Sequence, residues 1–240
     1  MVFEKLRREN YFHERLGFEC KEIDSYSINS YLYMHVRKDY LWPIETQINN
    51  YDESDVFTII EFLFDNCSKR SEEFNGYDWY NNYDRDLGIK TYLESINPIL
   101  QEYSTGFEIT EKGEIMNLAD NGMQIILSAN IPTNSKDEIT IKVENAISKF
   151  RKHNSSLDDK KDAVRELVDV LEFIRPQVKL NLLTKDENAL FEIANNFALR
   201  HHRPDQKFNY DKAIWYNWMF YLYLSTIHTV LRLIKKGNGN

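Results

Sequence analysis

Hydrophobic residues recur at helical spacing over much of this chain, and their pattern divides it into a row of amphipathic helices. In the first half, stripes of apolar side chains predict helices over 26–40, 54–70 and 88–102. Pro98 is expected to kink or split the last of these. The first eighteen residues carry weaker spacing and predict a short helix followed by a loop.

One segment alternates between apolar and polar residues instead. Residues 106–116 alternate around Lys112-Gly113, which predicts a small β-hairpin and the main sheet of the protein. The stretch 77–83 is rich in aromatic residues and asparagine, and we expect a loop there. Three aspartates in and after it, Asp78, Asp84 and Asp86, fit no calcium-loop spacing, which favours a solvated loop over a metal site.

The second half shows four longer stripes separated by short connections. They predict helices over 135–153, 156–176, 184–203 and 210–235, and pairs of capping residues mark the first three starts: Ser135 with Glu138, Ser156 with Asp159 and Thr184 with Glu187. Four helices joined in this way favour an antiparallel bundle. We therefore predict an all-α protein with a helical domain over 1–133, which contains the hairpin, and a helical bundle over 134–240.

Composition and charge narrow the functional classes. The 30 basic and 38 acidic side chains leave a net charge of −8, which argues against binding nucleic acid over the whole surface and limits such binding to a local patch. Two cysteines without a CxxC motif predict free thiols and neither a disulfide scaffold nor a zinc site. No dinucleotide glycine motif is present, so no cofactor is expected.

The expected location is the cytoplasm. The first ten residues scatter charge through the segment and lack the apolar core of a secretory signal. Residues 213–234 are long enough to span a bilayer, but they contain Asn217, His228 and Arg232. We therefore expect no membrane partner.

The most suggestive polar cluster lies where the third helix of the bundle ends. An apolar stripe through Ile193 and Phe197 continues, at the same helical spacing, into Arg200 and His201. Asn196 stands one turn before Arg200 and can share a ligand with it. Cations at a helix C-terminus interact favourably with the helix dipole, which accounts for the presence of His202 and Arg203. It accounts less well for Arg200 and His201, which extend the buried stripe.

The fourth helix of the bundle supplies a further candidate surface. One of its ridges mixes aromatic and polar groups, Trp218, Tyr221, Ser225, His228 and Arg232, and suits contact with a partner subunit or a site. His228 can be a packing histidine or part of that site. A metal site at His201 and His202 is not expected, because adjacent helical residues point about 100° apart and no third ligand is placed.

The C-terminal half resembles the HEPN superfamily of helical bundles, which includes prokaryotic toxins and abortive-infection nucleases. The resemblance rests on the four-helix order, on Asn-Asn-Phe-Ala-Leu-Arg-His over 195–201, and on the aromatic helix from Trp215 to His228. The N-terminal half is similar to the helical N-terminal domain of AbiJ-type abortive-infection proteins through residues 12–17, 57–63 and 106–115. Together the two resemblances cover nearly the whole chain.

The resemblance implies metal-independent RNA cleavage by a homodimer, in which arginine and histidine side chains of two subunits form one site. Arg200 would stabilise charge on the phosphoryl oxygens, and His201 or His202 would transfer protons. Asn196, Arg203, Tyr221 and His228 would contact the RNA. An antitoxin or companion defence protein is a further expected partner.

The sequence departs from the family pattern in one respect. The family signature continues from arginine and a polar residue to a histidine after four to six intervening residues, but that window holds Asp205, Gln206 and Lys207. The required spacing recurs from Arg7 and Arg8 to His13, outside the bundle. Three alternatives remain: His201 or His202 takes the role, His228 arrives from the next helix, or the bundle binds RNA or a partner without cleaving.

Overall fold

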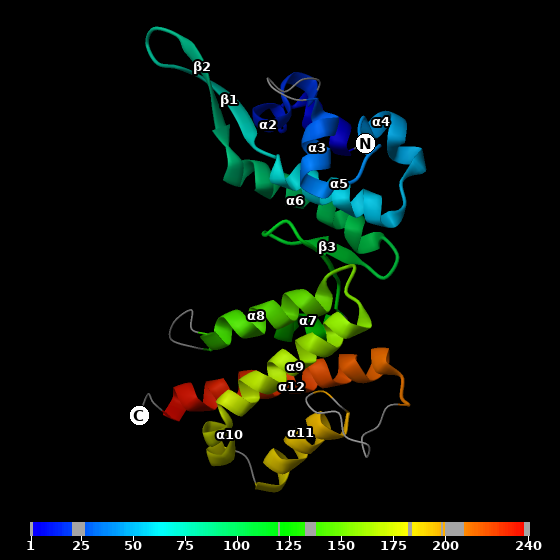
Figure 1. The fold of residues 1–240 in the computed structure, drawn as a ribbon. Coiled ribbons are helices and arrows are strands. Elements are labelled where there is room, and N and C mark those ends of the chain that lie inside the picture. Colours follow the sequence, from blue (N-terminus) through cyan, green and yellow to red (C-terminus); the bar gives the residue numbers. More distant parts are fainter. Residues whose placement is uncertain are drawn as a thin grey trace. The chain divides into compact units, whose positions relative to one another are not determined.

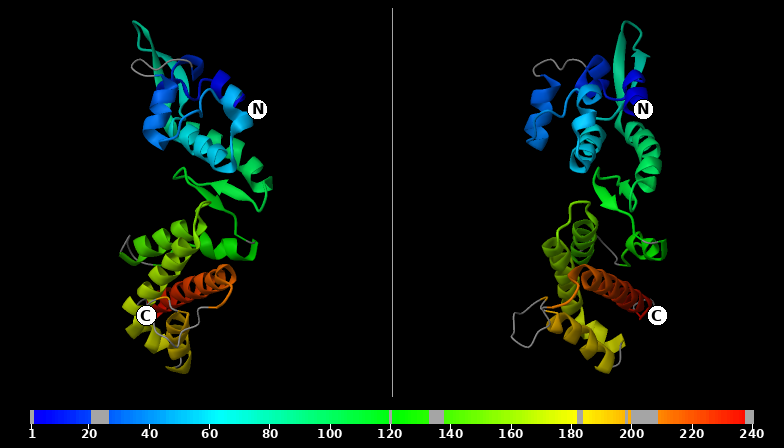
Figure 2. Two further views of the ribbon diagram at one scale, coloured as in Figure 1. Left: turned by 45° about the vertical axis from the view of Figure 1, so that its right-hand side comes forward. Right: turned by 90° about the vertical axis from the view of Figure 1, so that its right-hand side faces the viewer.

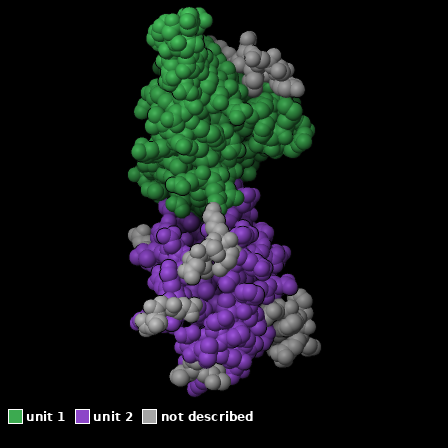
Figure 3. All heavy atoms as spheres, turned by 90° about the vertical axis from the view of Figure 1, so that its left-hand side faces the viewer, with its two compact units in different colours: residues 1–117 green, residues 118–240 purple. Residues whose placement is uncertain are grey.

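A computed structural model of the protein describes residues 2–20, 27–119, 121–132, 138–181, 184–197, 199 and 209–237. The fold is mostly helical with two small hairpins, which confirms the predicted all-α class (Figure 1). The chain divides into two compact units, Met1–Asn117 and Leu118–Asn240 (Figure 3).

The division lies earlier than the boundary near residue 133 that the sequence suggested. Before that predicted boundary the structure contains a further helix, α7 (Asn121–Leu127). Leu127 is buried in the hydrophobic core of the second unit. Because its apolar side chain is part of that core, this segment belongs to the second unit.

Unit 1 is built mainly from short helices around two longer ones. In chain order its elements are α1 (Val2–Arg8), α2 (His13–Leu16), η1 (Phe18–Cys20), α3 (Ile28–Val36), α4 (Ile44–Gln47), η2 (Ile48–Asn50), α5 (Glu53–Asp65), β1 (Lys69–Phe74), β2 (Trp79–Asp84), α6 (Arg85–Glu102), β3 (Phe107–Ile109) and β4 (Ile115–Asn117). The predicted helix over 26–40 is shorter in the structure, because Arg37 adopts a left-handed conformation that ends α3.

The long helices of unit 1 begin at aspartate caps. Asp52 and Asp55 form a reciprocal capping box at the start of α5. The side chain of Asp84 accepts a hydrogen bond from the backbone N–H of Leu87 at the start of α6. Pro98 does not split α6, because it lies on the exposed side, where water can bond the carbonyl group that it leaves unpaired.

The predicted hairpin over 106–116 is confirmed as β3 and β4, which pair in antiparallel register. It is attached to α6 through Asn97. The Asn97 side chain donates to the carbonyl of Ile109 at 3.1 Å and accepts from its N–H at 2.8 Å. A polar residue beside Pro98 therefore joins the small sheet to the helix.

The loop predicted over 77–83 is instead the second strand of another hairpin. β1 and β2 pair from Lys69↔Asp84 to Phe74↔Trp79, and the side chain of Asn75 accepts backbone hydrogen bonds from Tyr77 and Asp78 in the turn. This hairpin projects from the helices of unit 1 in Figures 1 and 2. Its residues are largely exposed on both faces, so the alternating burial that marks most antiparallel strands is missing.

Unit 2 contains the expected helices and two shorter ones. After α7 come α8 (Glu138–Arg151), α9 (Leu157–Phe173), α10 (Arg175–Asn181), α11 (Thr184–Asn196) and α12 (Lys212–Gly237). α9 packs against both α8 and α12 (Figures 1 and 2), and the rings of Phe150 and Phe220 stack at 3.9 Å. The Ser156–Asp159 capping box is confirmed. Ser135 lies outside the described residues.

Glu187, for which the sequence predicts a part in the cap of α11, forms an ion pair with Arg175 of α10. Its carboxylate lies 2.6 Å from Nε of Arg175 and is almost fully buried. The guanidinium of Arg175 also lies over the ring of Phe191, 4.2 Å from its centroid. Glu187 therefore joins the start of α11 to α10.

No described helix is both long and apolar enough to cross a membrane.

Candidate functional site

The two arginines and two histidines at the centre of the predicted site, Arg200, His201, His202 and Arg203, lie outside the described residues. The structure describes the residues that flank them and the helix expected to face them. Asn196 is the last residue of α11 and is exposed. The third helix of the bundle, predicted over 184–203, therefore ends at Asn196 in the structure.

An aromatic cluster connects the two sides of the segment 200–208. The hydroxyl of Tyr210 donates a hydrogen bond to the carbonyl of Phe197 at 3.1 Å. The ring of Phe197 lies 5.0 Å from that of Tyr210 and 4.7 Å from that of Trp215. Leu199 is also buried in the core of unit 2. The chain therefore leaves and re-enters the described structure at one aromatic cluster.

The cluster continues onto the surface of α12. The rings of Trp215 and Trp218 lie 5.4 Å apart, edge to face, and the two residues are 37% and 44% exposed. Exposed indole rings offer flat faces on which a nucleic-acid base can stack. Trp218 also lines a groove of about 370 Å³ between α11 and α12.

The groove has mixed chemistry. Leu190 and Ile193 of α11 face Trp218 and Leu222 of α12 across it. Three hydroxyl residues of α12, Ser225, Thr226 and Thr229, also line it, and each donates a hydrogen bond to a backbone carbonyl of the same helix. The remaining lining residues are Asp186, Ala189 and Val230. The oxygens of the three hydroxyl residues can still accept hydrogen bonds from a ligand.

Tyr221 and His228 lie on a different side of α12 from this groove. The ring of Tyr221 contacts that of Phe150 in α8. His228 follows Tyr221 by two helical turns on the same face, about 10 Å along the axis. Because the residues of α12 that line the groove with α11 are others, the structure groups Tyr221 with His228 and not with the α11 groove.

His228 is nearly inaccessible. It is 3% exposed, and neither ring nitrogen has a hydrogen-bond partner in the described part of the chain. Burial, followed by the charge of Arg232, lowers the pKa of His228 below its ordinary value of 6.5. Its imidazole is therefore held neutral and has little surface to offer to RNA in this conformation.

A second polar cluster, which the sequence reading missed, lies at the base of the β1–β2 hairpin. Nδ1 of His13 lies 2.7 Å from the hydroxyl oxygen of Tyr83, and the two rings are stacked. Burial, followed by the charge of Arg70, lowers the pKa of His13. Phe18 is 61% exposed and meets the edge of the same imidazole. His13 and Tyr83 are seventy positions apart in the sequence. A strand predicted over 79–84 would have indicated that they could meet.

Arg7 and Arg8 have the family spacing to His13, but their side chains pair with carboxylates and not with that histidine. Arg7 bonds Glu45 at 2.7 Å and Glu4 at 2.9 Å. The side chain of Arg8 is 78% exposed and approaches Glu4. Both guanidinium groups are thus directed to carboxylates of α1 and α4. In addition, the described residues contain no group of three or more His, Cys, Asp or Glu that could hold a metal ion.

Comparison of the chain with protein-family models, with curated proteins and with solved structures finds no match.

Proposed function

We propose that this protein is a HEPN-type endoribonuclease of phage defence or of a toxin system, which acts in the cytoplasm as a homodimer. The proposal rests on the cationic segment at the end of α11 and on its resemblance to the HEPN pattern. The observation that supports it best is the Phe197–Tyr210 hydrogen bond, which joins the two flanks of that segment beside exposed Trp215 and Trp218.

In the proposed site the side chains divide the work of phosphodiester cleavage. The guanidinium of Arg200 stabilises the charge that develops on the phosphoryl oxygens. The imidazole of His201 or His202 removes the proton of the attacking 2′-hydroxyl, and an imidazolium from the second subunit protonates the leaving 5′-oxygen. Asn196 and Arg203 orient the phosphate.

The proposed dimer forms through the bundle, on the exposed side of α12. Ile214, Trp215, Trp218 and Leu233 are all at least 37% exposed there, and helical spacing places them on one side of the helix. Exposed aromatic and aliphatic residues of this kind are typical of interfaces. The same surface would serve an antitoxin or companion defence protein.

The test is RNA cleavage in EDTA by the wild-type protein and by Arg200→Ala/His201→Ala. We expect cleavage by the wild type and a loss of at least 100-fold in the double variant, the typical size of one general acid–base contribution. Arg8→Ala/His35→Ala is the matched control, since it removes one arginine and one histidine from exposed positions of unit 1 and should leave the rate unchanged. Equal rates for the wild type and the Arg200/His201 variant would refute the proposal.

A second candidate is an RNA- or partner-binding module without cleavage. The burial of His228 favours it, because that imidazole is not available to replace the histidine missing from the family spacing. In the same assay such a module would retain RNA, or a companion protein, without producing fragments. Retention should then fall in the Arg200/His201 variant and not in the Arg8/His35 control.

A further inference from the structure

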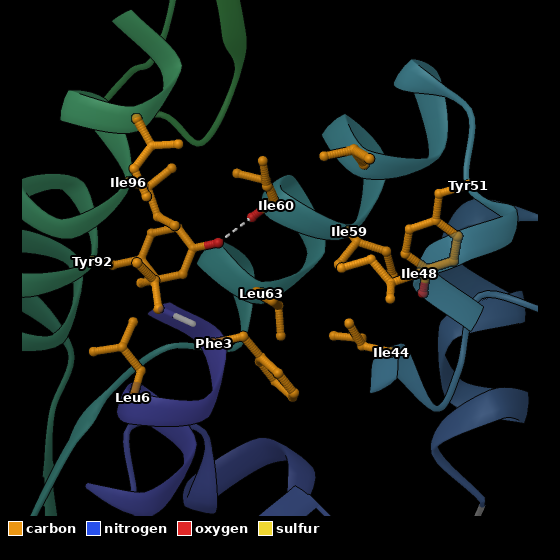
Figure 4. Close-up of a pocket in the computed structure, with 13 residues that line it drawn as sticks. Phe3, Leu6, Ile44, Ile48, Tyr51, Ile59, Ile60, Leu63, Tyr92 and Ile96 are labelled. Carbon is orange, nitrogen blue, oxygen red and sulfur yellow. Dashed lines mark hydrogen bonds between the residues drawn. The ribbon is translucent and has the colours of Figure 1, made fainter. Parts of the chain in front are cut away.

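The helices of unit 1 surround an apolar pocket of about 310 Å³. Side chains from α1, from α4 and η2, from α5 and from α6 point into it (Figure 4). Its deep residues are buried: Phe3, Leu6, Ile44, Leu63 and Tyr92 are all at most 8% exposed. The pocket is therefore a depression that reaches into the core of the unit.

The mouth of the pocket is aliphatic as well. Ile48, Val56 and Ile99 line it and are 38%, 39% and 55% exposed. An apolar ligand can thus enter without displacing water from charged groups. The contrast between this exposed rim and the buried floor indicates a site for a slender, inserted group, not for a flat protein surface.

The lining offers a ligand no free polar group. Of the thirteen lining residues only Tyr92 and Tyr51 carry hydroxyls. The Tyr92 hydroxyl donates to the carbonyl of Ile60 at 2.8 Å, drawn as a dashed line in Figure 4, and the Tyr51 hydroxyl donates to the carbonyl of Leu41. A polar atom placed inside would lose its hydrogen bonds to water and gain none, which excludes polar ligands.

The charges around the pocket argue against an anionic ligand. On α1, Arg7 bonds Glu45 and Glu4 through its two terminal nitrogens, and its Nε is closed off from solvent. At the rim, the first turn of α5 carries exposed Glu53, whereas Asp55 is buried and paired with Lys38. A carboxylate head group would meet Glu53 there, and the two terminal nitrogens of Arg7 on α1 already bond carboxylates.

We propose that this pocket binds one uncharged, unbranched alkyl chain of about eight to ten carbons, with its polar head group in solvent at the rim. The volume sets the length. Apolar cavities of about 150 Å³ stay dry and bind benzene, and one water-sized group takes about 30 Å³. The pocket of about 310 Å³ therefore has room for about ten such groups.

Displacement of the fluorescent probe N-phenyl-1-naphthylamine from the full chain tests this site, with 1-butanol, 1-hexanol, 1-octanol, 1-decanol and decanoate as competitors. We expect the alcohols to bind about fourfold more tightly for each added methylene up to about ten carbons, and then no further gain. Decanoate should bind about two- to fivefold more weakly than 1-decanol, because its carboxylate would lie at a rim that carries Glu53.

Two substitutions fill the mouth from opposite helices, Val56→Phe on α5 and Ile99→Trp on α6. Each should raise the Kd for 1-decanol at least tenfold. Both positions are exposed, so the fold should tolerate them, and circular dichroism selects the variants that are folded. Ile125→Phe, at a residue of α7 that is 76% exposed, is the matched control and should leave the Kd unchanged.

Three results would overturn the assignment. One is the absence of displacement by any alcohol up to its solubility limit. Another is an unchanged Kd in a folded filling variant. The third is sedimentation of the wild type as a dimer that both filling variants dissociate, since the pocket would then be covered by a second copy of the chain.

Discussion

The hydroxyl of Tyr210 donates a hydrogen bond to the backbone carbonyl of Phe197, and the two residues flank the cationic segment of the candidate site. Closing a loop at its base lowers the entropy that the loop must lose when it binds a ligand. The bond therefore holds together the two residues from which that segment leaves and returns.

Tyr210→Phe should keep the ring contacts with Phe197 and remove this bond. We expect the free energy of unfolding to fall by about 1 kcal/mol, measured by urea denaturation, and RNA cleavage or retention to weaken. Tyr77→Phe removes a hydroxyl from a residue that is 91% exposed and is the control. RNA activity equal to that of the wild type would show that the proposed site does not depend on this closure.

Gly88 should not tolerate a methyl group. A Cβ at this position would lie 2.6 Å from Cα of Ser68 and 2.9 Å from the backbone nitrogen of Lys69, so α6 and the start of β1 would have to separate. We expect Gly88→Ala to destabilise unit 1 by about 1–3 kcal/mol. Gly122→Ala in α7, where a Cβ meets nothing within 4 Å, is the control and should be neutral or stabilising by up to about 1 kcal/mol.

Loss of Arg175 should strongly destabilise unit 2. Arg175→Met leaves the carboxylate of Glu187 buried and without its 2.6 Å partner, at a cost of about 3 kcal/mol. The double variant Arg175→Met/Glu187→Leu should recover most of this loss, because it removes the buried charge together with its partner. A double-mutant cycle by urea denaturation measures the coupling, and purely additive effects would contradict it.

Acid should destabilise unit 2 through His228. Its pKa is lowered by burial, so the folded protein keeps a neutral ring while the unfolded chain takes up a proton below pH 6.5. The unfolded state then binds more protons, and stability falls with decreasing pH from 6.5 down to the folded pKa, by at most about 1.4 kcal/mol per unit.

His228→Leu should remove this part of the pH dependence and add about 1 kcal/mol at neutral pH, because two unbonded ring nitrogens leave the core. The pKa of His13 is also lowered, so protonation of the unfolded chain at His13 destabilises the fold in acid as well. The His228→Leu variant should therefore still lose some stability as the pH falls. Thermal unfolding between pH 5 and 8 is the measurement. An unchanged pH profile in His228→Leu would show that the ring is not the source.

The helices with clear apolar stripes could be predicted from the sequence, because one buried face and a polar cap specify them locally. α9, with its Ser156–Asp159 box, is the clearest case. α7 and α10, of seven residues each, are too short to show a period. β2 has no alternation of apolar and polar residues to mark it as a strand, since Trp79 and Tyr80 are adjacent and both are exposed.

The candidate site could be predicted only where it continues a local pattern. Phe197 extends the stripe of α11 and is buried as that stripe implies. Contacts between residues far apart in the sequence cannot be predicted from local spacing. A cap joins Glu187 to residues of its own helix, whereas the Arg175 that it binds lies in the preceding helix, α10. The His13–Tyr83 pair needs the register of a hairpin that the sequence pattern concealed.

The β1–β2 hairpin also bears on solubility. Each strand of a two-stranded sheet has one edge whose backbone groups can recruit another chain. On β1 four of the six residues are charged, Lys69, Arg70, Glu72 and Glu73, and charge of this kind discourages such pairing. β2 reads Trp-Tyr-Asn-Asn-Tyr before its final aspartate. The two edges are therefore unequally protected, and aggregation of the folded protein should begin at β2.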